Sequence, residues 1–295
     1  MRLGRYYLGR ILKFGRLTSE MIVQAILNPS IITSAKYEWT ITDVFDGRDE
    51  TPSFMYGELS KFLPLGDVTV VDTAEKAKLE QPTENLHVAS APFVYLPEFS
   101  GIAYLHVWNK IQEEVFPRRF KAIIESAYDN FFVRCDIEAI SDYLSFIAKI
   151  SRFERFIQIS AKVYPPNPLF GNLWKNLEEY LRKRNLEELS VKESAAEEGE
   201  GIHTEIPSLM EILESNGAFS DPAPSLTDAA LLMAADGYGS GKVVGIRNDT
   251  VAVVRTIETK KSFPFDKRPI PKALAQRAWE EFDAINKKRG IEHND

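Results

Sequence analysis

Residues 131–164 read FFVRCDIEAISDYLSFIAKISRFERFIQISAKVY, and the spacing of their apolar residues changes twice. The segments 131–139 and 155–164 are rich in aromatic and β-branched residues, which favour strands. Between them, Ser141 is a candidate N-cap, and apolar residues follow it at helical spacing. The stretch therefore predicts a strand, a helix and a second strand.

Strand patterns dominate upstream of this stretch, from residue 1 to about 108. The segment 37–41 alternates apolar and polar residues, which is the period of a strand with one buried face. A short helix is expected after Ser19. Pro and Gly at 64–67 and the polar segment 72–85 predict turns and loops.

Downstream, the pattern predicts short helices at 207–215 and 225–237, a hairpin at 243–257 and a final helix that begins at Pro271. Strands and helices thus alternate along much of the chain. We expect an α+β fold, with a mixed, largely antiparallel sheet, packed helices, and a smaller C-terminal lobe built as helix, hairpin and helix.

The acidic segment 193–205 is poor in apolar residues and is typical of a loop or linker. It divides the chain into a main mixed domain, 1–192, and a C-terminal lobe, 206–295. The alternative is that 206–295 belongs to one continuous domain with the rest.

The composition narrows the class of protein. The chain has 295 residues, 44% of them hydrophobic, and a net charge of −7, so it folds but has no overall basic field to attract nucleic acid. Cys135 is the single cysteine, which excludes an internal disulfide and a multi-cysteine zinc site and suits a reducing compartment. We expect a cytoplasmic protein without a bound metal or cofactor and without membrane insertion.

No complete catalytic motif is present, so the sequence leaves open whether the protein is an enzyme. The run at 236–242, DGYGSGK, lacks the first Gly and the following Ser or Thr of a phosphate-binding loop. One alternative is a metal-dependent nuclease, in which two carboxylates hold a divalent ion and a lysine stabilises charge. Its candidate residues are Asp236, Glu258 and Lys260.

Cations gather locally despite the acidic total. Three clusters are candidates for binding nucleic acid through its phosphates, with an affinity that would fall steeply with salt. They are Arg2, Arg5, Arg10, Lys13 and Arg16 at the N-terminus; Arg118, Arg119 and Lys121; and Arg182, Lys183 and Arg184.

Several segments together resemble a prokaryotic family known only as a domain of unknown function and met near phage-defence and mobile-element genes. They are YGELSKF at 56–62, FVYLP at 93–97 with GIAY at 101–104, the strand at 156–164, and ADGYG at 235–239. The resemblance implies a bacterial protein with a role in anti-phage defence that acts on or senses nucleic acid. We expect a non-enzymatic recognition or assembly component that forms homo-oligomers and binds DNA, RNA, or a phage or partner defence protein.

Overall fold

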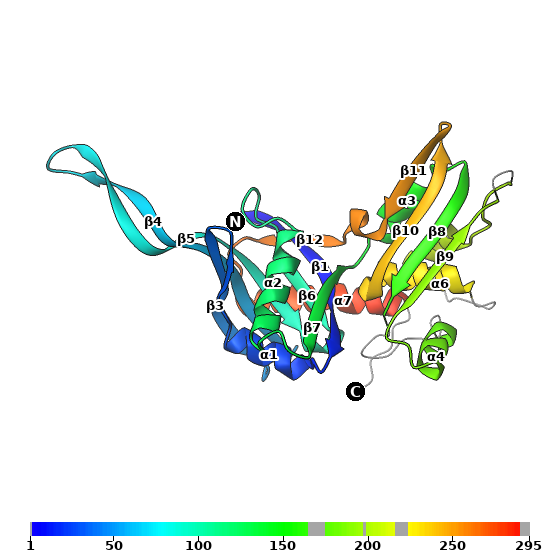
Figure 1. Ribbon diagram of the computed structural model, residues 1–295, viewed down its shortest axis with the longest axis horizontal. Helices are drawn as coiled ribbons and strands as arrows, with labels where there is room; N and C mark the ends of the chain where they lie inside the picture. Colours follow the sequence, from blue (N-terminus) through cyan, green and yellow to red (C-terminus); the bar gives the residue numbers. More distant parts are fainter. Residues whose placement is uncertain (1, 165–174, 197–198, 216–223, 290–295) are drawn as a thin grey trace.

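The computed structural model describes residues 2–164, 175–196, 199–215 and 224–289. Its strands form two antiparallel sheets, one at the centre of the molecule and one at its end (Figure 1). The α+β class and the largely antiparallel pairing expected from the sequence are confirmed.

The central sheet contains eight strands, and the N-terminal segment is an interior strand that pairs with three others. In spatial order the strands are β12 (Ser262–Asp266), β1 (Leu3–Gly15), β6 (Gly101–Leu105), β5 (Ala77–Leu96), β4 (Phe54–Asp72), β3 (Tyr37–Gly47) and β2 (Ile32–Ser34), and β7 (Val133–Ala139) also pairs with β1.

Helices cover both faces of the central sheet. Helices α1 (Ser19–Leu27) and α2 (Val115–Ser126) pack on one face, and α7 (Pro271–Arg289) packs on the other. Pro117 does not kink α2, because the helix begins at Val115 and the proline lies in its first turn, where an N–H is not needed.

The second sheet has four strands and a core of its own. Its order is β11 (Thr250–Arg255), β10 (Gly239–Arg247), β8 (Arg155–Val163) and β9 (Leu189–Ser194). One face packs on helices α3 (Tyr143–Ile150), α4 (Lys175–Lys183), α5 (Ile206–Glu214) and α6 (Leu226–Met233). Short helical turns complete the fold: Pro97–Phe99, Ala234–Tyr238, which is a π-helical turn named η2, and Thr256–Thr259.

The C-terminal part of the chain is shared between the two sheets. Strands β10 and β11 complete the second sheet, β12 is an edge of the central sheet, and α7 covers the central sheet. Residues 206–295 therefore contribute to both cores.

Residues 63–86, in which turns and loops were expected at 64–67 and 72–85, instead form a long β-hairpin. The register between β4 and β5 continues without a break from Leu65↔Glu84 to Asp72↔Ala77. Figure 1 shows this hairpin projecting from the central sheet, at the opposite end of the molecule from the four-stranded sheet. We call residues 63–86 the arm. The sequence pattern did not reveal this strand pair, because the segment is polar and neither of its faces packs into a core.

Candidate functional site

The candidate catalytic residue Asp236 lies in the core. Its side chain is fully buried, and its carboxylate accepts hydrogen bonds from the Tyr143 hydroxyl and the Arg289 guanidinium. Burial raises the pKa of Asp236, and the adjacent Arg289 opposes that shift. The Arg10 guanidinium donates to the backbone carbonyl of the same aspartate, at 2.9 Å. Asp236 therefore joins η2 to β1, α3 and α7.

The two other nuclease candidates lie elsewhere. Glu258 is at the surface, where its carboxylate is 3.2 Å from Arg255 and 3.5 Å from Lys149. The Lys260 ammonium lies 5.8 Å from the centre of the Tyr7 ring, and burial lowers its pKa. The structure brings none of the three candidates into contact with another. Across the described residues, no group of three or more His, Cys, Asp or Glu side chains is placed to hold a metal ion.

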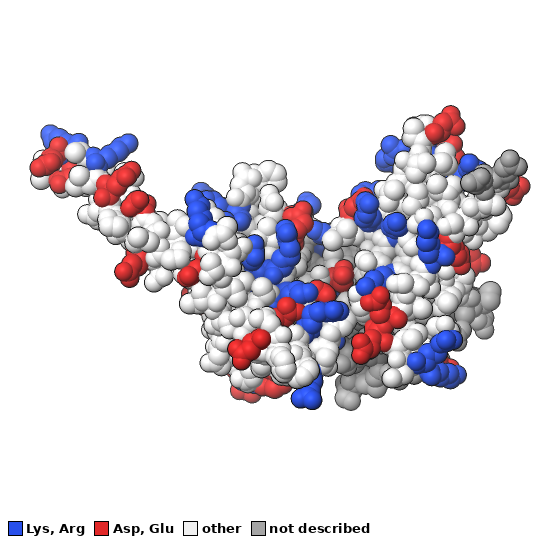
Figure 2. Space-filling view, viewed as in Figure 1, with Lys and Arg blue, Asp and Glu red and all other residues white. Residues whose placement is uncertain are grey.

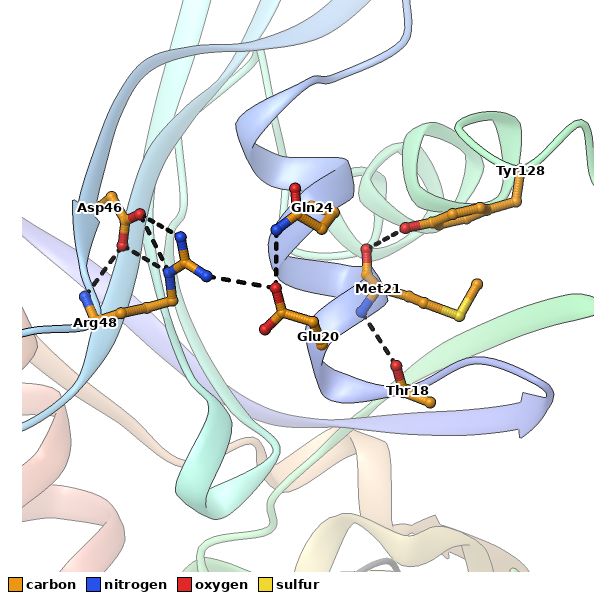
Figure 3. A network of polar contacts seen from close by, with 7 residues as sticks. All are labelled: Thr18, Glu20, Met21, Gln24, Asp46, Arg48 and Tyr128. Carbon is orange, nitrogen blue, oxygen red and sulfur yellow. Dashed lines mark hydrogen bonds and ion pairs between the residues drawn. The ribbon is translucent and has the colours of Figure 1, made fainter.

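Arg48, in the turn that follows β3, contacts two acidic side chains. The Arg48 guanidinium donates to both carboxylate oxygens of Asp46 and also reaches Glu20 on α1, at 3.4 Å (Figure 3). The hydrogen bonds from Arg48 lower the pKa of Asp46. This contact fastens the turn to the start of α1, whose first turn is capped by the Thr18 hydroxyl.

The N-terminal cations do not form one surface, because β1 is a central strand. Arg10 is only 1% exposed and donates to Phe99 and Asn286 as well as to Asp236, so a surface ligand cannot reach it. Lys13 is half-buried and donates to the hydroxyls of Ser19 and Ser100. The exposed members of the cluster are Arg2, Arg5 and Arg16.

The helical clusters are divided in the same way. On α2, Arg118 is exposed, Arg119 lies over the Trp39 ring, and Lys121 pairs with Asp136 at 2.5 Å. On α4, Lys183 pairs with Glu179. Arg184, just after that helix, lies over Tyr180, and the side chain of Arg182 is outside the described part of the chain.

A different basic surface is formed where three strands carry the same short motif. Ser160-Ala161-Lys162 lies on β8, Ser190-Val191-Lys192 on β9 and Ser240-Gly241-Lys242 on β10. In each motif the middle residue faces the helices or packs against their core, so Ser and Lys point to the open side of the sheet.

The strand register converts these motifs into a checkerboard. Ser160 on the middle strand lies opposite Lys192 on one side and Lys242 on the other. Lys162 lies opposite Ser190 and Ser240. Arg255 on β11 lies opposite Lys242 and extends the row. We call these seven residues the Lys–Ser face.

The Lys–Ser face lines a shallow depression of about 540 Å³ that also includes Glu138. Lys162 pairs with Glu188 at 2.7 Å, and Arg255 pairs with Glu258. Figure 2 shows both signs of charge on this side of the molecule. The side chains of Lys192 and Lys242 make no ion pair or hydrogen bond with any described residue, so two of the four cations are available to an outside anion.

This arrangement can bind the oxygens of phosphate or carboxylate groups. Each lysine offers three N–H donors and each serine one hydroxyl donor, and adjacent strands place them about 5 Å apart. Such donors bind the phosphate oxygens of a nucleic-acid backbone without contacting the bases. The sequence signal for this face was the repeated Ser-x-Lys spacing. Without the strand register, the three motifs could not be assigned to one surface.

The molecule is thus an α+β protein whose most distinctive open surface is a lysine- and serine-rich sheet. The chain belongs to the family described as a domain of unknown function, DUF4747, whose model matches residues 19–222. That match includes β8 and β9 of the Lys–Ser face and the whole arm. No curated protein matches the sequence. None of the described helices is both long and apolar enough to cross a membrane.

Proposed function

We propose that this protein is a non-enzymatic recognition component that binds nucleic acid through the phosphate backbone, on the Lys–Ser face, and that it serves in bacterial anti-phage defence. The observation that carries the binding proposal is the register that surrounds Ser160 with Lys192 and Lys242, neither of which has a partner among the described residues. The defence role rests on the family resemblance.

The chemistry of the face favours backbone contacts. Lysine neutralises phosphates as a point charge, and the serine hydroxyls between the lysines donate to phosphate oxygens. The ion pairs of Lys162 and Arg255 are exposed, and exposed pairs contribute little free energy, so phosphates can replace their carboxylate partners. The protein's net charge of −7 opposes long-range attraction, so binding depends on this local surface.

Fluorescence anisotropy with labelled single-stranded and double-stranded DNA and RNA of one sequence tests the proposal. The triple variant Lys162→Gln, Lys192→Gln and Lys242→Gln is expected to bind roughly tenfold more weakly or worse, because phosphate contacts are lost. A matched variant, Lys36→Gln, Lys110→Gln and Lys287→Gln, removes the same charge elsewhere and should bind like the wild type.

A third variant separates the face from the helical clusters that the sequence singled out. Arg118→Gln, Lys183→Gln and Arg184→Gln should leave affinity nearly unchanged. Equal losses in all three variants would show binding by overall charge, and no binding to any probe at low salt would overturn the proposal. Cleavage of the probes that requires Mg²⁺ would instead support the nuclease alternative.

The defence role has its own test. Bacteria that express the protein with its neighbouring genes would be challenged with a panel of phages, and plaque counts compared for the wild type and the Lys–Ser face triple variant. We expect protection by the wild type and its loss in the variant. Equal plaque counts with and without the wild-type protein for every phage would contradict the role.

A further inference from the structure

The arm has charged and apolar side chains but forms no ion pair with the part of the chain that the structure describes. Residues 63–86 contain five acidic residues and two lysines, and none of these seven makes an ion pair with a described residue. The acids are Asp67, Asp72, Glu75, Glu80 and Glu84. A two-stranded ribbon is at best marginally stable by itself in water, so a projecting arm of this length gains from a partner surface.

One face of the arm combines acids with aliphatic side chains. Residues directly opposite each other in an antiparallel pair point to the same side. Leu65↔Glu84, Asp67↔Pro82, Thr69↔Glu80 and Val71↔Lys78 therefore share a face. Leu65 is 65% exposed and Val71 is 66% exposed, so this face offers three carboxylates and two uncovered aliphatic groups.

The open side of the four-stranded sheet has the complementary combination. Beyond the cation row, the outward positions of β11 continue as Val253 and Val251, which are 37% and 64% exposed. Phosphate groups would gain nothing from contact with these aliphatic side chains. The sheet therefore presents lysines and arginine at one end of its strands and valines at the other, over a length of about 20 Å that equals the length of the arm's face.

From this complementarity we infer that the arm of one copy docks on the Lys–Ser face of a second copy, with its carboxylates against the lysines and its aliphatic groups against the valines of β11. The arm and the face lie at opposite ends of the molecule, so an arm cannot reach the face of its own chain (Figure 1). The docked carboxylates occupy the positions where the proposed function places phosphates, so self-association and nucleic-acid binding compete. The competition rests on the proposed function; the docking does not.

Charge exchange tests the contact directly. The arm variant carries Asp67→Lys, Glu80→Lys and Glu84→Lys, and the face variant carries Lys162→Glu, Lys192→Glu and Lys242→Glu. Sedimentation velocity over a range of concentrations should show the wild type associating, more strongly at low salt, and each variant alone associating at least about tenfold more weakly. Mixing the two variants should restore association, because the unchanged arm of the face variant meets the unchanged face of the arm variant and the reversed arm meets the reversed face.

A control variant with the same charge change outside the arm and the face, Asp49→Lys, Glu211→Lys and Glu280→Lys, should associate like the wild type. A wild type that stays monomeric at every concentration, or a mixture no more associated than its components, overturns the docking. Nucleic-acid anisotropy distinguishes the two proposals: the arm variant should bind nucleic acid at least as well as the wild type. If no probe binds but the mixed variants associate, the docking stands and the proposed function fails.

Discussion

The Arg289 guanidinium donates to the Asp236 carboxylate in the core, and each side chain is 1% exposed. This pair joins the last turn of α7 to η2, so the helix that covers the central sheet is fastened to the start of β10. The Tyr143 hydroxyl donates to the same carboxylate oxygen at 2.8 Å, and the Arg289 guanidinium lies 3.7 Å from the centre of the Tyr143 ring. Asp236 therefore has a structural position between the two sheets.

Asp236→Asn should destabilise the protein by about 3 kcal/mol or more, because the buried Arg289 would lose its hydrogen-bonded anion and keep only the Glu214 carboxylate, 3.8 Å away. Tyr143→Phe, which removes only a hydroxyl donor, should cost about 1 kcal/mol. Urea unfolding followed by circular dichroism measures both. The exposed Glu258→Gln serves as the control, with a change within about 0.5 kcal/mol. A cost for Asp236→Asn no larger than that of the control would contradict this account.

Gly239 begins β10, the strand that carries Ser240 and Lys242. A Cβ on Gly239 would lie 2.0 Å from the Lys162 carbonyl oxygen, which belongs to the neighbouring strand and cannot move away cheaply. Gly239→Ala should therefore cost at least about 2 kcal/mol and weaken nucleic-acid binding. Gly199→Ala, whose Cβ would have its nearest contact at 3.5 Å, should be near neutral. Similar melting temperatures for the two variants would show that the close contact between Gly239 and the Lys162 carbonyl does not limit stability.

The dependence of affinity on salt should identify the Lys–Ser face. Each phosphate contact contributes roughly 0.7–0.9 to the slope of log affinity against log salt. Lys192→Gln and Lys242→Gln should each reduce the slope by about that amount, whereas Lys110→Gln, outside the face and the arm, should leave it unchanged. Anisotropy titrations at several salt concentrations give the slopes. Unchanged slopes in both face variants would exclude these lysines from phosphate contact.

Glu138 gives the depression a dependence on pH. Burial raises the pKa of Glu138 to about 7, with the Asp136 carboxylate adding to the shift and Lys162 opposing it. The carboxylate becomes negative as pH rises through about 7, so affinity for nucleic acid should fall over that range, and Glu138→Gln should flatten the profile. Anisotropy at a series of pH values measures this. A wild-type profile identical to that of the variant would rule out a role for Glu138.

The same shift affects stability. The folded pKa of Glu138 lies above its ordinary value of 4.5, so its contribution to stability is complete below about pH 4.5 and is lost as pH rises through about 7. Urea unfolding of the wild type should show this loss, and Glu138→Gln should show a smaller one. A larger loss of stability in Glu138→Gln than in the wild type would mean that the Glu138 carboxylate is paired in the folded protein and stabilised there.

The local pattern of apolar residues was sufficient to predict most of the elements. The strand at 155–164, the hairpin at 243–257 and the helix from Pro271 all form close to where the spacing indicated them. These segments bury one face, and burial imposes a period of two or 3.6 that is visible in the sequence. The arm escaped prediction because neither of its faces enters a core.

The candidate site depended on contacts between distant residues. Asp236 looked like a catalytic acid, yet its carboxylate contacts Arg289, which lies 53 residues further along the chain. Arg10 looked like a surface cation until β1 proved to be a central strand. Ser160, Lys192 and Lys242 share a surface only through the antiparallel register of β8, β9 and β10. The sequence by itself determined most of the segments that form strands and helices, because a segment that buries one face shows a period set by neighbouring residues. Only the tertiary structure decided which charges lie in the core and which converge on one face, because strand register is set by packing between segments far apart in the chain.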